Sequence, residues 1–237
     1  MASAGPTADG PNPRVLPLTD PDSPFIENYR RLYRRILYFH QQRGFRSFGI
    51  TSAASGEGKT LTSINLSLVM SEDPKKKVIL IECDFRRPQV ARYLGLHAIR
   101  GLADVILRRA PLGEVVREVK ASRLKVLPAG KLGAELTHVL HDSALNETIA
   151  ALKRQYDFVI VDTPPILPIA DQAFLADLVD GLVLVVRAGK TPKDMLQTAL
   201  EIIKDKNLLG VVLNGFDRKI ANYYHYKYSH YYSKKQK

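Results

Sequence analysis

The sequence predicts an α/β domain in which a mostly parallel β-sheet is covered by helices on both faces. Strand-like and helix-like segments alternate along most of the chain, which is typical of this class. Several of the strand-like segments are unbroken runs of Val, Ile and Leu, as expected for strands that are buried on both faces. The strand-like segments are residues 47–51, 78–83, 124–128, 158–161, 182–187 and 209–214. The helix-like segments between them are residues 59–71, 101–107, 142–155, 171–178 and 192–205.

The α/β domain is expected to span residues 23–218, between two segments of different composition. Residues 1–22 are rich in Pro, Gly, Ala and Asp, and this composition predicts a disordered leader. A helix should open the domain, because apolar side chains recur every three to four residues between Phe25 and Leu37. Residues 219–237 form a basic tail rich in tyrosine.

Composition excludes several classes of protein. The chain of 237 residues has 35 Lys and Arg against 24 Asp and Glu, so its net charge of +11 favours phosphate-bearing partners or a solvated basic surface. Its single cysteine excludes an internal disulfide framework. The sequence has no secretory signal at its start and no apolar run near the roughly 18 residues of a membrane span. We therefore expect a soluble, intracellular protein.

A phosphate-binding loop follows the first predicted strand. Residues 53–60 read AASGEGKT and precede a predicted helix. Small residues let successive backbone N–H groups converge on an anion, while Lys59 reaches the terminal phosphates and the Thr60 hydroxyl ligates Mg²⁺. Ala53 stands where the usual pattern has glycine. The context predicts a P-loop NTPase-like fold that binds the phosphates of a nucleotide through Ser55, Gly56, Glu57, Gly58, Lys59 and Thr60.

Acidic residues end two buried strand-like runs. Glu82 and Asp84 end the first, and Asp162 ends the second. Ligands of open α/β sheets bind outside the carboxyl ends of the strands, so Asp84 and Asp162 should lie at the phosphate site, where a metal ion is needed. Arg86 pairs either with a phosphate or with Asp84, and the sequence leaves both readings open. Asn214, at the end of the last strand, is the candidate for an adenine contact.

The tail concentrates the tyrosines of the chain. Six of the eleven fall within ten residues, among lysines and histidines and without an acidic residue. Aromatic residues in a basic segment suit stacking on single-stranded nucleic acid, a membrane interface, or a cluster of phosphate acceptors. The six are Tyr223, Tyr224, Tyr226, Tyr228, Tyr231 and Tyr232.

Five features occur in a fixed order along the chain. They are a helix with Ser23-Pro24, Glu27 and Tyr29-Arg30, the loop SGEGKT, a strand ending ECDFRRP, a strand ending DTPP, and the tyrosine-rich tail. From residue 24 to the C-terminus the sequence thereby resembles the bacterial tyrosine kinases of polysaccharide biosynthesis, which are autokinases on a P-loop ATPase fold. The resemblance implies that Lys59 grips the β- and γ-phosphates of ATP. It also implies that Thr60, Asp84 and Asp162 serve Mg²⁺ directly or through water.

The resemblance also implies a catalytic base. At the position of Glu82 the family has an aspartate close to the acceptor hydroxyl, where it helps remove the proton. Glutamate keeps the carboxylate but adds a methylene group, which alters the geometry of proton transfer. Lys59, Glu82, Asp84 and Asp162, with Arg86, form the implied catalytic set.

Partners follow from the same resemblance. It implies that one protomer phosphorylates the tail tyrosines of its neighbour in a homo-oligomer, which in the family is a ring packed through E-x-x-R-x-x-R. Here Tyr33 stands at the final arginine position, with Arg34 one residue further on. A membrane-embedded polysaccharide co-polymerase would act as activator in trans and hold a cytoplasmic kinase at the inner face of the membrane. Sugar-nucleotide enzymes are further candidate substrates, and nucleic acid is not an expected ligand.

Two alternatives remain open at this point. One is an ATPase of the partition and septum-positioning class, whose loop K-G-G-x-G-K-[ST] carries a lysine where this chain has Ala54. The other is an ATP-binding adaptor of a polysaccharide export complex, in which Glu82 has disabled phosphate transfer. Phosphotyrosine in the tail separates the kinase from both alternatives.

Overall fold

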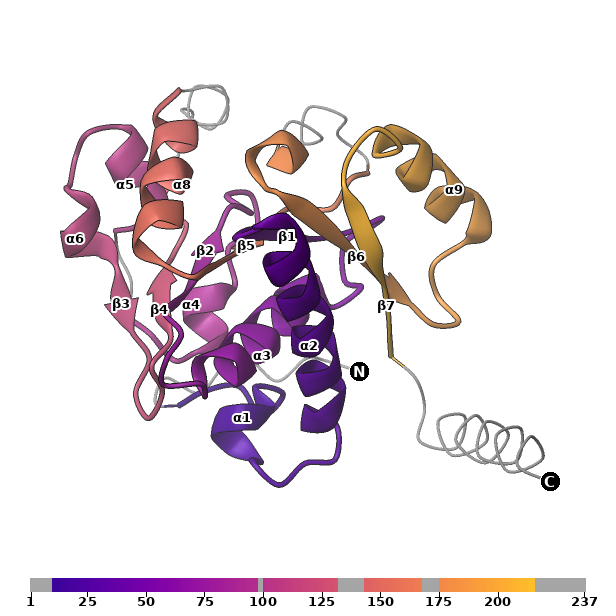
Figure 1. Cartoon of the computed structure of the whole chain (residues 1–237), viewed down its shortest axis with the longest axis horizontal. Helices are drawn as coiled ribbons and strands as arrows, with labels where there is room; N and C mark the ends of the chain where they lie inside the picture. Colours follow the sequence, from indigo (N-terminus) through magenta and orange to yellow (C-terminus); the bar gives the residue numbers. More distant parts are fainter. Residues whose placement is uncertain (1–9, 98–99, 132–142, 168–174, 216–237) are drawn as a thin grey trace.

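A seven-stranded sheet forms the centre of the part of the chain that the computed structural model describes, residues 10–97, 100–131, 143–167 and 175–215 (Figure 1). The strand order is β3-β4-β2-β5-β1-β6-β7, and every neighbouring pair is parallel except β3 and β4. The strands are β1 (Ser47–Ser52), β2 (Val78–Glu82), β3 (Arg117–Glu118), β4 (Lys125–Leu127), β5 (Phe158–Asp162), β6 (Gly181–Arg187) and β7 (Leu208–Asn214). This sheet confirms the predicted fold class.

Helices pack on both faces of the sheet. The described helices are α1 (Leu16–Thr19), α2 (Ile26–Arg43), α3 (Lys59–Ser71), α4 (Val90–Tyr93), α5 (Leu102–Ile106), α6 (Leu112–Val115), α8 (Ser143–Gln155) and α9 (Lys193–Ile202). Alternate residues of the central strands enter two separate cores, as the pleat requires. Phe158 and Ile160 of β5 pack with α2 and α3, whereas Val159 and Val161 pack with α5 and α8. The unbroken apolar runs are therefore strands buried on both faces.

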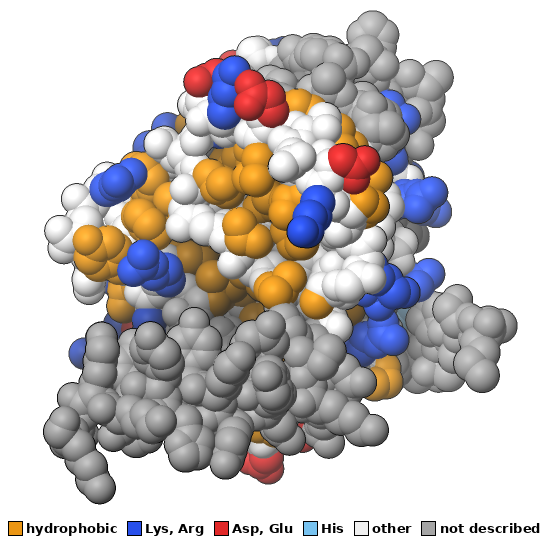
Figure 2. All heavy atoms as spheres, turned by 90° about the vertical axis from the view of Figure 1, so that its right-hand side faces the viewer, with side chains coloured by type: hydrophobic (Ala, Val, Ile, Leu, Met, Phe, Trp, Pro, Cys, Tyr) orange, Lys and Arg blue, Asp and Glu red, His pale blue; other side chains and the backbone are white. Residues whose placement is uncertain are grey.

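The edge strand β7 departs from that pattern. Val211 and Leu213 are 54% and 50% exposed, although the sequence of β7 is as apolar as that of β6. Figure 2, which faces this side of the molecule, shows hydrophobic side chains at the surface. The reason is position, because β7 is last in the strand order.

The structure contains short elements that were not predicted, and one predicted helix differs. The short antiparallel strand β3 was not predicted, since its two residues carry no apolar pattern. A helix was predicted over residues 171–178, of which residues 175–178 form a single 3₁₀ turn and residues 171–174 lie outside the described part.

The predicted disordered leader is wrong for residues 10–22. Val15 is fully buried against α3, and the short helix α1 follows it. Asn65 of α3 binds this segment at two points. Its Oδ1 accepts a hydrogen bond from the Leu16 N–H at 2.9 Å, and its Nδ2 donates to the Arg14 carbonyl at 3.0 Å. The composition of the leader could not reveal this, because the partner lies about fifty residues away along the chain.

Candidate active site

A cavity of about 890 Å³ lies at the carboxyl ends of the strands, where β1 passes into α3. It contains most of the residues that the sequence predicts for the site. Those that line it are Ser55, Gly56, Gly58, Lys59, Thr60, Asp84, Arg86 and Asn214. Glu57, Glu82 and Asp162 are predicted site residues that do not line it. The six predicted acceptor tyrosines lie outside the described residues.

The phosphate loop is already folded for an anion. Gly56 and Gly58 have φ angles of +82° and +95°, which side chains other than glycine rarely allow. A Cβ atom at Gly58 would also lie 2.0 Å from Nδ2 of Asn214. The Glu57 carboxylate turns back, accepting a hydrogen bond from the Ala54 N–H at 2.9 Å and another from the Thr191 hydroxyl. Glu57 therefore shapes the loop instead of facing the cavity.

Two residues from the ends of β6 and β7 hold this loop in place. Arg187 Nη1 donates to the Gly56 carbonyl at 2.8 Å, and Asn214 Nδ2 donates to the Glu57 carbonyl at 2.8 Å. Asn214 was predicted as an adenine contact, and the structure places its amide on the loop backbone at the edge of the cavity. Arg187 was not predicted. Its one signal in the sequence is a charged residue at the end of an apolar strand.

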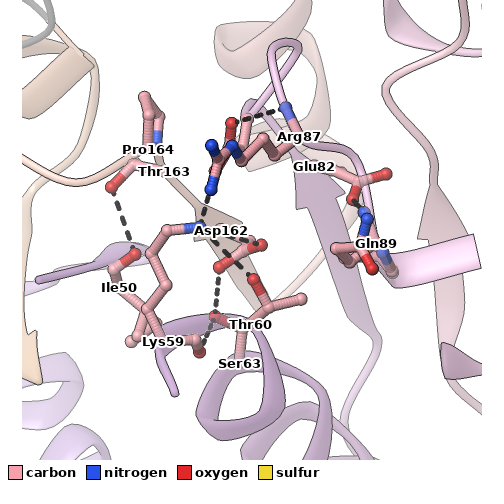
Figure 3. A network of polar contacts seen from close by, with 12 residues as sticks. Ile50, Lys59, Thr60, Ser63, Glu82, Arg87, Gln89, Asp162, Thr163 and Pro164 are labelled. Carbon is pink, nitrogen blue, oxygen red and sulfur yellow. Dashed lines mark hydrogen bonds and ion pairs between the residues drawn. The ribbon is translucent and has the colours of Figure 1, made fainter. Parts of the chain in front are cut away.

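Lys59 is the centre of a buried charge cluster (Figure 3). Its Nζ lies 2.7 Å from Oδ2 of Asp84 and 4.0 Å from Oδ2 of Asp162. Burial alone would lower the pKa of Lys59, but the charges of Asp162 and Asp84 outweigh burial, so the pKa is raised and the ammonium stays charged. Lys59 is thus a charged side chain, held between two carboxylates, that is suited to bind a phosphate.

Asp162 has an oxygen that fits a metal ion. Its side chain is 0% exposed, and Oδ1 accepts a hydrogen bond from the Ser63 hydroxyl at 3.0 Å. Within the described residues Oδ2 has no hydrogen-bond partner, and burial raises the pKa of this carboxyl. Those same residues contain no group of three His, Cys, Asp or Glu side chains around one point. Mg²⁺ usually binds through one or two carboxylates plus water and phosphate oxygens, so the donor set suits it.

Glu82, the implied catalytic base, is buried and does not line the cavity. Its Oε1 accepts hydrogen bonds from the N–H groups of Gln89 and Val90 at the start of α4, and Oε2 accepts one from Ala129 N–H at 3.2 Å. Figure 3 shows its carboxylate directed at Gln89, away from Lys59. Its place beside an acceptor hydroxyl, which the family resemblance implies, stays a prediction. Glu82 holds α4 against the sheet.

The position of Glu82 predicts a pH-dependent stability. Burial raises its pKa from 4.5 to about 7, so between these pH values the folded state binds a proton that the unfolded chain does not. Stability should therefore fall as the pH rises through this window, by about 3 kcal/mol at most. Glu82→Gln cannot titrate, and its free energy of unfolding should vary less between pH 5 and pH 8 in urea titrations. Glu147→Gln, an exposed change on α8, should keep the full dependence; an unchanged slope in Glu82→Gln would contradict the assignment.

Together, the loop between β1 and α3, the buried lysine and the acidic ends of two parallel strands define a P-loop ATPase-type domain. Residues 47–207 match the family described as the AAA domain. The chain is 35% identical to tyrosine-protein kinase YwqD of Bacillus subtilis over 90% of both chains. It is 32% identical to tyrosine-protein kinase CpsD of Streptococcus agalactiae, over 83% of this chain and 86% of that one.

Solved structures agree with these sequence matches. The kinase domain of VpsO has a TM-score of 0.70 at 28% identity, covering 82% of this chain and all of that one. The chimeric protein CapA2B2 has a TM-score of 0.81 at 25% identity, covering 89% and 93%. The chain belongs to the bacterial tyrosine-protein kinases, and its match covers 90% of the length of YwqD.

Proposed function

We propose that this tyrosine kinase transfers the γ-phosphate of ATP to the tail tyrosines of a neighbouring copy, and so regulates the synthesis and export of exopolysaccharide or capsule. The observation that carries the proposal is the buried Lys59–Asp84–Asp162 cluster beside a preformed phosphate loop, at a cavity of about 890 Å³. The names of its relatives support tyrosine as the acceptor.

The loop and the cluster have separate tasks in this proposal. The backbone N–H groups of residues 55–60 and the helix N-terminus bind the phosphates, and Lys59 exchanges Asp84 for phosphate oxygens. Thr60, Asp84 and Asp162 would hold Mg²⁺, which neutralises charge on the phosphates when bound. Phosphoryl transfer requires mainly such positioning and neutralisation.

Asp84 and Arg86 take the roles nearest to the acceptor. Asp84 lines the cavity, and we assign to it the place beside the tyrosine hydroxyl that the resemblance implies for Glu82. Arg86 forms no ion pair with Asp84 or another carboxylate within the described ranges, which favours contact with a phosphate over the structural pair. Asn214 remains a candidate for the base-binding end of the cavity.

The proposed assembly is a homo-oligomer with an activating membrane partner in trans. The same unit covers 30% of the longer tyrosine-protein kinase Wzc of Salmonella typhi, and CapA2B2 is a chimerical protein. Both observations support a kinase that works with a second component, such as a co-polymerase at the membrane. In the described parts of this chain no helix is long and apolar enough to cross a membrane. Sugar-nucleotide enzymes stay proposed substrates.

Mass spectrometry of the protein after incubation with Mg²⁺ and ATP tests the transfer. We expect phosphate on residues 223–232, and none on a variant with all six tail tyrosines changed to phenylalanine. Mixing that variant with Lys59→Ala, whose tail is intact but whose site is not, should place phosphate on the Lys59→Ala tail, since transfer occurs between copies.

The same experiment would also detect a second candidate function, that of an ATPase. The cell-division ATPase MinD of Pyrococcus furiosus shares the fold, with a TM-score of 0.62 at 26% identity over 73% of both chains. ATP hydrolysis without phosphate on the tail would favour an ATPase of that class. ATP binding without either reaction would favour the adaptor.

A further inference from the structure

We propose that the cavity contains a subsite for phosphotyrosine, formed by Arg14, Arg86 and Arg87, so that the first phosphate on a tail promotes transfer to the next tyrosine. The inference rests on the proposed function, because it takes the tail as the acceptor. It adds to the site two residues, Arg14 and Arg87, that have no assigned part in the transfer reaction itself.

The cavity has two ends because of the strand order. Arg187 and Asn214 come from β6 and β7, on one side of β1, while Arg86 and Arg87 follow β2, on its other side. The phosphate loop lies between the two ends. One end therefore adjoins the loop through β6 and β7. The other, which we call the arginine end, is lined by Arg14, Arg86 and Arg87 and adjoins Asp84.

Arg14 is brought to the arginine end by the ordered part of the N-terminal segment. Asn12 N–H donates to the Tyr93 carbonyl at 2.8 Å, and the Arg14 carbonyl accepts from Asn65 Nδ2. Val15, the next residue, is fully buried. The backbone is thus fixed on both sides of Arg14, while its side chain is exposed at the cavity.

The three arginines are available for an anion. Arg14, Arg86 and Arg87 are exposed, and across the described ranges none forms an ion pair with a carboxylate. Asp84, an acid that lines the cavity, is already paired with Lys59 at 2.7 Å. Arginine binds phosphate through parallel hydrogen bonds, which suits a phosphate monoester. Tyr93 lines the same end and offers an aromatic surface for the ring that carries the phosphate.

The charge of the tail explains why the ligand should be phosphotyrosine and not tyrosine. From Arg218 to Lys237 the chain has six Lys or Arg residues and no acidic residue, so an unmodified tail is repelled by three arginines. Each phosphate brings a charge of about −1.5 to −2, which reverses this repulsion locally. The tyrosines follow one another at intervals of one to three residues, so a bound phosphotyrosine leaves another tyrosine close to Asp84.

The chemical step is the same at each tyrosine. The bond between the γ-phosphorus of ATP and the β–γ bridging oxygen breaks, and a bond between that phosphorus and the tyrosine oxygen forms. ADP leaves, and the hydroxyl proton passes to water. Only the affinity for the tail changes after the first transfer.

Two measurements on Arg14→Gln test the subsite. In intact-mass time courses, the rate of the second and later phosphates relative to the first should fall about tenfold, the scale of one lost charge-assisted hydrogen bond. Arg154→Gln, an exposed change on α8 away from the cavity, should keep the wild-type ratio. An unchanged ratio in Arg14→Gln would overturn the proposal.

Peptide binding separates this inference from the proposed function. A fluorescent peptide of residues 221–232 with phosphate on Tyr226 should bind the wild-type protein at least about tenfold more tightly than the unphosphorylated peptide, and Arg14→Gln should remove most of the difference. Equal binding of the two peptides would overturn the subsite even if the tail is phosphorylated. Preferential binding in a protein whose tail takes no phosphate would keep the subsite and reject the proposed transfer.

Discussion

Lys59→Met is expected to lower tyrosine phosphorylation by roughly 10²–10³-fold, the scale of losing one preorganised group that stabilises transition-state charge. Lys59 Nζ is held between Asp84 and Asp162 at the end of the phosphate loop, where the terminal phosphates bind. Methionine keeps the apolar stem of the side chain but removes the charge. Phosphotyrosine formed per minute, measured by mass spectrometry at saturating Mg²⁺ and ATP, gives the ratio to wild type.

Stability measurements show whether Lys59→Met loses phosphorylation because the protein no longer folds. Burial raises the pKa of Asp162 and the charge of Lys59 lowers it, so without the ammonium this pKa should rise further and Lys59→Met should lose stability as the pH rises. Lys190→Met, an exposed change in the loop after β6, should alter neither property. A Lys59→Met protein that is folded by circular dichroism and phosphorylates at more than a tenth of the wild-type rate would reject the role of Lys59.

Asp162→Asn is expected to give opposite effects on activity and stability. Phosphorylation should fall by roughly 10²–10³-fold, because an amide is a poor substitute for a carboxylate beside Mg²⁺. The free energy of unfolding at pH 8 should stay equal or rise, because the charged form of Asp162 is buried and its raised pKa shows that folding disfavours that form. Urea titrations of the protein without nucleotide measure the second effect.

Ser63→Ala is the matched control for Asp162→Asn. It removes the hydroxyl that donates to Asp162 Oδ1 but leaves the carboxylate in place. Its activity should fall by less than about tenfold, the scale of one hydrogen bond. If Asp162→Asn kept near wild-type phosphorylation at limiting Mg²⁺, Asp162 would not be a metal ligand.

Local sequence patterns were enough to predict the phosphate loop and the acidic residues of the site. A small-residue loop ending in Gly-Lys-Thr must follow a strand and begin a helix, so it identifies Lys59 and Thr60 without a structure. Asp84 and Asp162 follow from the rule that parallel strands place their carboxyl ends at one edge. Both predictions depend only on short-range sequence and on the direction of the strands.

Glu82 shows what only the tertiary structure decided. It is the register partner of Asp162 on the neighbouring strand, so both residues sit at equivalent positions at the end of the sheet. Asp162 meets α3 and the phosphate loop, whereas Glu82 meets the N–H groups of α4. The helix that covers each strand end sets the role of the acid, and the sequence of the strand does not contain that information.

The same reason explains the other residues that sequence reasoning missed or misplaced. Arg187 and Asn214 hold the loop of a strand distant in sequence, and the segment around Val15 is ordered by Asn65. By itself the sequence determined the fold class, the kinase motifs and the order in which they occur, because each of these depends on residues that are neighbours along the chain. Which side chains meet across the cavity depended on packing between segments far apart in the chain, and only the folded structure brings those segments together.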